Sequence, residues 1–446
     1  MHYPGFLQKE NLNRNLKLLD SILFILFIAF LVLIIATSTK VNIAADSVDY
    51  YAMLQWVTPE SEKPIVGNLH FAEQRSPGYS LLSLIPYSLL TVFVEPLVTT
   101  EKISSNVSPE YPNEIPGKTE SQRKMAGSEM MFLPQQPLHI KDLFFKDYYV
   151  PGSHSWFQWK LALSLLITSY FFLFAGIWAN VTALKLYAPS WQFRTLVPLV
   201  LVSSPVFIIN IIELPLYATL TSYGQASLFA LFVCISARSK NAWHIFSAGL
   251  MLGLLVLTRL ELSIMAVLLI GYLIFTRNLR FLAFFSLGGS VAFFALVLYN
   301  LALFGVPLHF GILRGDINTF GFSIDYIFDN LLHPASGVLF FTPLLIPGLL
   351  FLVTGKNGLL KVLGFCSFIL IIFYTLRIPI MYYHIGQGII DIGGVPVTAP
   401  ETLAQMRELI RSDINRYLSV FIPFSIIGFS TGIDRIFRIL AQETAT

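Results

Sequence analysis

Long apolar segments recur along almost the whole chain, and they constrain its fold more than any other feature. About eleven segments are long enough, or nearly long enough, to span a bilayer as helices. Because no water reaches the hydrocarbon core, a spanning segment must satisfy its own backbone hydrogen bonds, in a helix or a closed barrel. Runs this long, without apolar–polar alternation, exclude the barrel. We therefore predict an all-α, polytopic integral membrane protein with helices at residues 21–38, 79–98, 159–184, 195–213, 218–237, 244–258, 260–276, 281–304, 336–354, 361–376 and 417–434.

The composition supports a membrane protein along the full length. The chain has 446 residues, of which 55% are hydrophobic and 12% charged, whereas soluble proteins carry about 25% charged residues. We expect residues 1–446 to form a single transmembrane domain. The formal net charge of +3 is explained by cytoplasmic loops and does not suggest a nucleic-acid partner. Cys234 and Cys366 lie inside apolar runs, so we interpret them as packing residues.

The basic residues predict the orientation of the chain in the membrane. Lys9, Arg14 and Lys17 precede the first span, which places the N-terminus in the cytoplasm under the positive-inside rule. Later basic pairs mark alternate loops as cytoplasmic, namely Lys185/Arg194, Arg238/Lys240, Arg277/Arg280, Lys356/Lys361 and Arg435/Arg438. The loops 39–78, 305–335 and 377–416 are then external.

One segment conflicts with this count. If residues 79–98 cross the membrane, the polar insert at 99–150 is cytoplasmic, yet the downstream charges require it to be external. Either the 79–98 segment is re-entrant or one of the weak spans is miscounted. The short spans 244–258 and 260–276 are the other candidates for a miscount.

Two acids in the first external loop are the leading candidates for chemistry. Asp46 and Asp49 follow the first span directly, and residues at i and i+3 share one face of a helix. Tyr50 and Met53 lie on the same face. A carboxylate at the membrane interface can act as a general base, or two can hold a divalent cation. A solvated helix face is the alternative interpretation.

Three arginines are candidates for binding an anionic head group. Arg75 precedes Pro77 and Gly78, where the chain returns to the membrane, and Arg416 opens the last span. Arg259 lies with Glu261 inside an apolar stretch, where charges are costly and face the protein interior or a wet cavity. Residues at i and i+2 on a helix point different ways, so we expect at least one of this pair to have a partner elsewhere. The alternatives are snorkelling arginines and a structural ion pair.

Glu213, Glu261 and His333 are weaker, accessory candidates. Glu213 lies at the start of an external turn, and His333 lies in the 305–335 loop with Arg314. We expect a lone histidine to be a packed residue more often than a catalyst. The sequence has no P-loop, no Rossmann glycine pattern, no Cys/His metal spacing and no GxSxG elbow. Nucleotide-driven transport and serine hydrolysis therefore lack support, and a divalent cation is possible but not required.

Six short motifs, in order along nearly the whole chain, resemble the GT-C superfamily of membrane glycosyltransferases, especially bacterial relatives of the dolichyl-phosphate-mannose protein mannosyltransferases. The segments that carry the resemblance are Asp46-Ser47-x-x-Tyr50, Arg75-Ser76-Pro77-Gly78-Tyr79 (similar to R-P-P-G-Y), Leu257-Thr258-Arg259-Leu260-Glu261 (similar to L-T-R-P-E), Tyr299-Asn300 with Phe304-Gly305-Val306-Pro307, Pro334 to Pro343, and Arg416-Tyr417-Leu418 with Pro423-Phe424. Ser76 and Leu260 each stand where the motif has a proline.

The resemblance implies an activity. Such enzymes take a sugar from a polyprenyl-phosphate donor at the outer membrane face and pass it to a lipid, glycan or protein acceptor, usually with inversion. It implies that Asp46, by its spacing to Tyr50, is the base, with Asp49 beside it. It also implies that Arg75, Arg259 and Arg416 meet the donor phosphate, in the bacterial inner membrane as part of cell-envelope metabolism. Two other functions remain open: a transporter or flippase for a lipid-linked saccharide, and a polysaccharide polymerase or ligase that uses Arg314 and His333.

Overall fold

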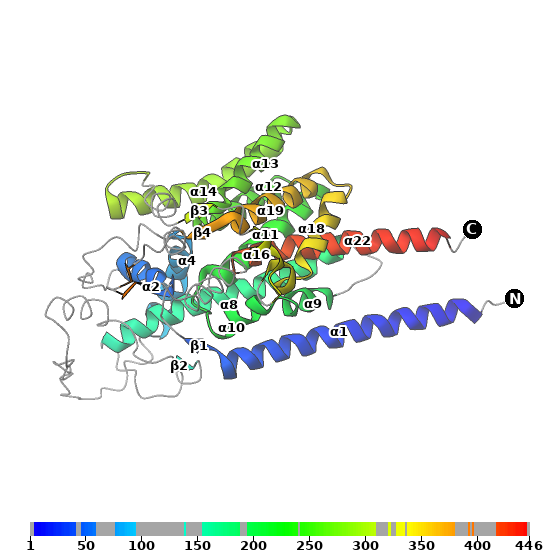
Figure 1. Cartoon of the computed structure of the whole chain (residues 1–446), viewed down its shortest axis with the longest axis horizontal. Coiled ribbons are helices and arrows are strands. Elements are labelled where there is room, and N and C mark those ends of the chain that lie inside the picture. Colours follow the sequence, from blue (N-terminus) through cyan, green and yellow to red (C-terminus); the bar gives the residue numbers. More distant parts are fainter. Residues whose placement is uncertain are drawn as a thin grey trace.

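The computed structural model describes thirteen stretches of the chain: residues 4–41, 46–58, 76–94, 138–139, 154–187, 194–239, 241–308, 320–322, 327–334, 337–379, 391–392, 395–396 and 416–443. Almost all of the described residues are helical (Figure 1). Each predicted apolar segment coincides with one or more helices, so the all-α prediction is confirmed.

Five of the predicted segments are unbroken α-helices: α1 (Pro4–Ser38), α8 (His154–Tyr187), α11 (Ala218–Ser239), α14 (Leu279–Phe304) and α19 (Gly358–Leu376). A sixth predicted segment is also a single unbroken helix, α12 (Ala242–Thr258). The others combine two elements each: α4 (Gly78–Leu89) with η1 (Leu90–Val94), α9 (Leu196–Val202) with α10 (Pro205–Ile212), η2 (Leu260–Leu262) with α13 (Ser263–Phe275), α17 (Val338–Phe341) with α18 (Leu345–Thr354), and η4 (Ser419–Phe421) with α22 (Ile422–Glu443).

Two of these breaks occur at prolines. The predicted helix at 195–213 is interrupted at Ser204, whose φ of −107° and ψ of 90° are extended, directly before Pro205. The residue before a proline is sterically driven away from the α region. Thr342, before Pro343, likewise leaves the helical region and separates α17 from α18.

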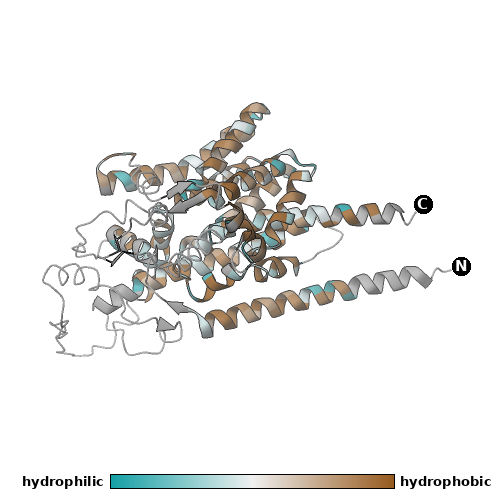
Figure 2. Ribbon diagram, viewed as in Figure 1, coloured by the Kyte–Doolittle hydropathy of each residue, from teal (hydrophilic) through white to brown (hydrophobic). Residues whose placement is uncertain are grey.

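Six helices of the described residues are long and apolar enough to cross a membrane: Asn15–Ser38, Lys160–Leu186, Ala218–Ser239, Leu279–Ala302, Gly358–Leu376 and Arg416–Ile433. The helices at Gly78–Val94, Ala242–Thr258, Leu260–Phe275 and Leu345–Thr354 are shorter. Figure 2 shows hydrophobic residues along α1 and α14, where large apolar side chains such as Ile25, Leu33 and Phe294 are exposed. Apolar side chains exposed over a whole helix suit a lipid environment, and the protein is an integral membrane protein.

The helical core is held together by close backbone contacts. Gly249 of α12 lies against the backbone of Phe285, and Gly288 of α14 lies against Phe246, so neither position has room for a Cβ atom. Small residues allow helices in membranes to approach closely enough for extensive packing. The resulting α12–α14 pair lies beside α11, which also packs on α8 (Figure 1).

The loops that carry the predicted cytoplasmic charges meet at one end of the molecule, here called the basic end. Arg238, in the last turn of α11, donates a hydrogen bond to the carbonyl of Leu186, at the end of α8. The α13–α14 turn and the start of α19 meet the end of α11 around a common cavity. Both chain termini lie toward this end in Figure 1. The opposite end, which contains α2 (Asp46–Val57), is called the α2 end.

The α4 helix runs back toward the α2 end and lies beside only half of α8. Near the start of α4, Tyr79 donates a hydrogen bond to the carbonyl of Leu165 (2.8 Å). At its far end, Lys160 donates to the Thr91 hydroxyl (3.4 Å), and Lys160 begins the candidate span of α8. The two helices are therefore antiparallel, and α4 with η1 starts midway along α8 and ends at the α2 end. This path is the one that the re-entrant alternative for residues 79–98 implies, as far as Val94, where the described part of the segment ends.

Short strands add connections outside the helices. Strands β1 (Lys40–Val41) and β2 (Leu138–His139) are antiparallel, so part of the 99–150 insert returns to the end of α1. Strands β3 (Phe320–Phe322) and β4 (Arg377–Pro379) join the 305–335 and 377–416 segments. Strands β5 (Asp391–Ile392) and β6 (Val395–Pro396) form a local pair. The short helix α16 (Ile327–Leu332) packs on α19.

Candidate functional site

The site is built around a break in the helical backbone at Arg259. Helix α12 ends at Thr258, and Arg259 is extended, with φ −142° and ψ 95°, before the 3₁₀ turn η2. Arg259 Nη1 therefore lies 3.5 Å from Glu261 Oε1. This corrects the expectation that the two side chains point different ways, which assumed an α-helix through both residues. The expectation of further partners is confirmed for both residues, as the next contacts show.

Arg259 is buried, with 6% of its surface exposed. Its Nε donates a hydrogen bond to Ser222 Oγ (3.0 Å), and its Cζ lies 4.6 Å from the centre of the Tyr417 ring. A guanidinium group has five N–H donors and stays charged in proteins. Among the described residues, hydrogen bonds engage only Nε and Nη1 of Arg259, which leaves Nη2 able to donate to a ligand oxygen.

A second arginine shares the Tyr417 ring. Arg416 Cζ lies 5.5 Å from the centre of that ring and 4.6 Å from the Tyr217 ring. Its side chain is also buried, at 7% exposure. Cation–π contacts of this kind stabilise a desolvated cation by up to about 2 kcal/mol. Two of the three predicted phosphate-binding arginines, Arg259 and Arg416, are therefore brought together although they are far apart in the chain.

Tyr374 completes the aromatic wall of the site. Its ring is stacked on Tyr417, with the ring centres 5.3 Å apart and the planes at 4°. Its hydroxyl donates a hydrogen bond to Glu261 Oε1 (3.2 Å). Glu261 is consequently held by both Arg259 and Tyr374, which fixes the orientation of the arginine from the side opposite Ser222.

Helix α2 brings the acidic segment to this cluster. Tyr50 is buried within electrostatic range of Arg259, and its ring packs edge-on against Tyr79 at 5.1 Å. Its backbone carbonyl accepts a hydrogen bond from Ser80 (2.8 Å). The helix begins at Asp46, one turn before Tyr50, as predicted. The side chains of Asp46 and Asp49 lie outside the described part of the structure.

The segments around Ser76 and Leu260 pack directly on each other. Ser76 Oγ accepts a hydrogen bond from the Leu260 backbone N–H (3.1 Å). A Cβ atom on Gly78 would lie 2.5 Å from the Thr258 nitrogen, so this position requires glycine. Ser76 and Leu260 are the two residues that replace prolines of the resembled motifs, and each replacement supplies one partner of this bond. Arg75 directly precedes Ser76 and lies outside the described residues.

An apolar groove begins beside this junction. Its volume is about 330 Å³, and its lining includes Ser76 and Leu260 at one end and Gly249 and Ile270 deeper along α12 and α13. The third wall is α14, where Gly289, Ala292 and Leu296 line the groove. The groove therefore runs along membrane-embedded helices from the residue next to Arg259.

Glu261, one of the accessory candidates, belongs to the Arg259 cluster, and the other two, Glu213 and His333, each follow the end of a short helix. Glu213 ends α10, four residues before Tyr217. The His333 carbonyl accepts a hydrogen bond from Gly337 N–H (2.7 Å) and closes a tight turn after α16. The neighbouring Asn330 donates to the Thr375 carbonyl (2.8 Å), so this turn lies near Tyr374. Arg314 lies outside the described residues. In the described part of the chain, no three His, Cys, Asp or Glu side chains gather as a metal site.

Sequence reasoning identified both arginines but missed most of their surroundings. Ser222 and Tyr374 lie in separate predicted spans and Tyr217 lies just before the first of these, and nothing in their local sequence distinguishes them from packing residues. Tyr417 was part of a motif but had no assigned role. The one available signal was the cluster of hydroxyl residues that begins α11, because buried hydroxyls imply hydrogen-bond partners.

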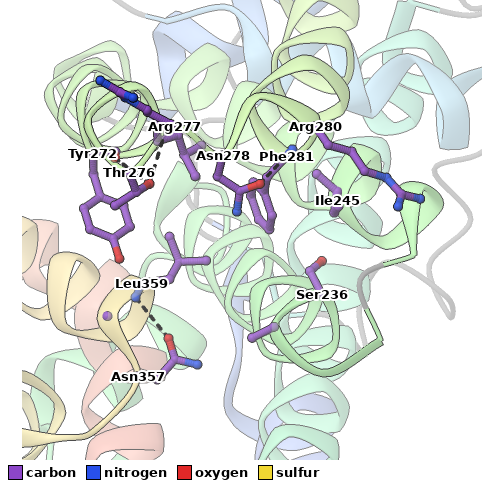
Figure 3. Close-up of a pocket in the computed structure, with 13 residues that line it drawn as sticks. Ser236, Ile245, Tyr272, Thr276, Arg277, Asn278, Arg280, Phe281, Asn357 and Leu359 are labelled. Atoms are coloured by element: carbon purple, nitrogen blue, oxygen red, sulfur yellow. Dashed lines mark hydrogen bonds between the residues drawn. The ribbon is translucent and has the colours of Figure 1, made fainter.

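A larger cavity, of about 550 Å³, lies at the basic end and not at this cluster (Figure 3). Its lining includes Arg277 and Arg280 but none of the residues around Arg259. The two sites are therefore distinct.

Comparisons with known proteins give one structural match. No protein-family model matches the chain, and no curated protein matches it. Among solved structures, the chain is similar to ArnT from Cupriavidus metallidurans bound to undecaprenyl phosphate, with a TM-score of 0.46 and 10% sequence identity. The match covers 94% of this chain and 63% of that one, so the chain spans less than two thirds of the length of ArnT.

Proposed function

We propose that the protein is a GT-C-like glycosyltransferase that moves a sugar from a polyprenyl-phosphate donor to an acceptor hydroxyl at the external membrane face. One observation carries this proposal. Arg259 and Arg416 converge on the Tyr417 ring, beside the helix that begins at Asp46 and at the mouth of an apolar groove. A lipid-phosphate donor needs cations, a lipid path and a nearby base together.

The proposed chemistry is a single displacement. The acceptor hydroxyl gives its proton to the Asp46 carboxylate as its oxygen bonds to the anomeric carbon of the sugar. The bond from that carbon to the donor phosphate breaks, and polyprenyl phosphate leaves with the electron pair. Arg259 and Arg416, with Arg75 next to Ser76, stabilise the negative charge that develops on the phosphate. Attack opposite the leaving group inverts the configuration.

The groove is proposed to hold the first part of the polyprenyl chain. It is apolar and adjoins Leu260, the neighbour of Arg259. A phosphate at Arg259 would therefore have its hydrocarbon chain continue between α12, α13 and α14. The exposed apolar face of α14 gives this path direct access from lipid.

The base is tested with purified protein and labelled polyprenyl-phosphate sugars. We expect Asp46→Asn to lower transfer about 10²-fold to 10⁴-fold, the usual range for loss of a general base. Asp49→Asn, one turn away, serves as the matched control and should retain most activity. Both variants should express and bind the donor like wild type. Full transfer by both variants would contradict the role of Asp46.

The lipid path is tested by filling the groove. Ala266→Phe places a ring into the groove, whereas Val267→Phe places it on a neighbouring position that is 67% exposed and does not line the groove. We expect only the first to weaken binding of a long-chain polyprenyl phosphate, while transfer from a short-chain donor analogue survives in both. Equal effects of the two substitutions would exclude this groove.

A further inference from the structure

The cavity at the basic end has the composition of a site for an amphiphilic anion. The residues in Figure 3 come from α11, α12, α13, α14 and α19. Ile245, Leu273 and Phe281 supply an apolar part, and Arg277 and Arg280 supply positive charge. None of the lining residues, all within the described part of the chain, is acidic.

The depth of the cavity matches the boundary of the apolar helices. Candidate spans end at Ser239 and begin at Leu279 and Gly358, and the cavity lies among these three helix ends. Its apolar residues therefore face the hydrocarbon side and its arginines the polar side. A lipid head group with the start of its chains has the same arrangement.

The conformation of Arg277 is costly and therefore informative. Its φ is 52°, the one positive value among non-glycine residues that the structure describes. Arg277 N–H donates to the Ile274 carbonyl (3.0 Å) and Asn278 N–H to the Leu273 carbonyl (3.0 Å). These bonds form a Schellman motif at the end of α13, in which glycine usually occupies the position of Arg277. Strained residues persist where the side chain has a use.

Arg280 is also placed against local preference. Asn278 caps α14 by accepting a hydrogen bond from Phe281 N–H (3.3 Å), so Arg280 lies in the first helical turn. A cation there opposes the helix macrodipole, whereas an anion bound there is favoured. Figure 3 shows the two arginine side chains extending away from each other, on either side of Asn278. Both are exposed, so they can turn toward an anion bound at the helix end between them.

We propose that this cavity binds the phosphate of an anionic membrane lipid, with Arg277 and Arg280 contacting the phosphate and Leu273 and Phe281 contacting the chains. The site is at the end opposite the Arg259 cluster. Lipid binding at this cavity requires no sugar transfer, so it can be tested independently of the proposed enzymatic activity.

The test measures the thermal stability of the full-length protein in nanodiscs of phosphatidylglycerol and of phosphatidylcholine. We expect phosphatidylglycerol to raise the wild-type melting temperature relative to phosphatidylcholine. Arg277→Gly and Arg280→Gln should each lose at least half of that increase. Glycine suits the left-handed position, so Arg277→Gly should fold at least as well as wild type in phosphatidylcholine.

The matched control is Lys356→Gln, which removes the same charge from an exposed residue next to the lining residue Asn357. It should retain the phosphatidylglycerol effect. An equal increase in all four proteins, or an equal loss in Lys356→Gln, would overturn the proposal in favour of general surface charge. Inorganic phosphate added to protein in neutral detergent provides the second arm. The full stabilisation from phosphate alone would overturn the lipid assignment.

Discussion

The two ends of the molecule use arginine in opposite ways. At the α2 end, Arg259 is buried and held by Ser222, Glu261 and Tyr417. At the basic end, Arg277 on the turn after α13 and Arg280 in the first turn of α14 are exposed, beside the larger cavity. The difference teaches that cavity size is a poor guide to chemistry here. Burying a charge is expensive, so the end with the buried, hydrogen-bonded cation is the better candidate for catalysis.

The largest contrast is expected from removing one arginine at each end. Arg259→Gln leaves Glu261 with Tyr374 as its remaining described partner and should lower the free energy of unfolding by about 3 kcal/mol, the range for breaking a buried pair. Donor-dependent transfer should fall about 10²-fold or more. Arg280→Gln should change the unfolding free energy by less than about 0.5 kcal/mol. Denaturant titration and transfer assays measure both, and equal effects at the two ends would break the comparison.

The shared aromatic ring gives the next effect. Tyr417→Leu removes the surface between Arg259 and Arg416 and the stack on Tyr374, which should cost about 1–3 kcal/mol of stability. Tyr417→Phe keeps the ring and should retain most of this stability. A Phe variant as unstable as the Leu variant would assign the effect to the hydroxyl group instead.

A smaller loss of stability is expected from breaking the hydrogen bond between Ser76 and Leu260. Ser76→Ala leaves the partly buried Leu260 N–H without this acceptor and should cost about 1 kcal/mol. Adding Leu260→Pro to Ser76→Pro removes both partners of the bond, as in the resembled motifs. The double variant should therefore lose less unfolding free energy than the two single variants lose together. A double-mutant cycle measures this coupling, and simple additivity would show that the two positions are independent.

The smallest effect has the opposite sign. Arg277→Gly relieves the left-handed conformation and should raise the unfolding free energy by about 0.5–1 kcal/mol, since the flexibility of glycine in the unfolded chain offsets part of the gain. Thermal unfolding in neutral detergent measures it. A destabilised variant would mean that the Arg277 side chain contributes to folding.

Local sequence was sufficient to predict the helices and the two buried arginines. Apolar length alone located the eleven predicted segments. A charge inside apolar sequence marked Arg259, and a place at the start of the last span marked Arg416. The path of α4 could not be predicted, because hydropathy does not distinguish a helix that crosses from one that turns back. The contact of Ser76 with Leu260 joins residues 184 positions apart, and a single sequence holds no signal for such pairs. The breaks at Ser204 and Thr342 do follow from local sequence, because each residue precedes a proline.

Helix α1 packs on the rest of the protein through a narrow apolar stripe that includes Leu31 and Ile35. Midway along the helix, the Asp20 carboxylate accepts hydrogen bonds from the backbone of Arg194 and Thr195. At the finish, Thr39 meets Tyr170. Only 6% of the apolar stretch within its candidate span, Asn15–Ser38, is buried within the protein. During synthesis this helix can therefore settle in lipid long before its docking partners leave the ribosome, 174 residues after Asp20 in one case. Until then Asp20 must be satisfied by water or head groups, so final docking of the first helix is a late event in assembly.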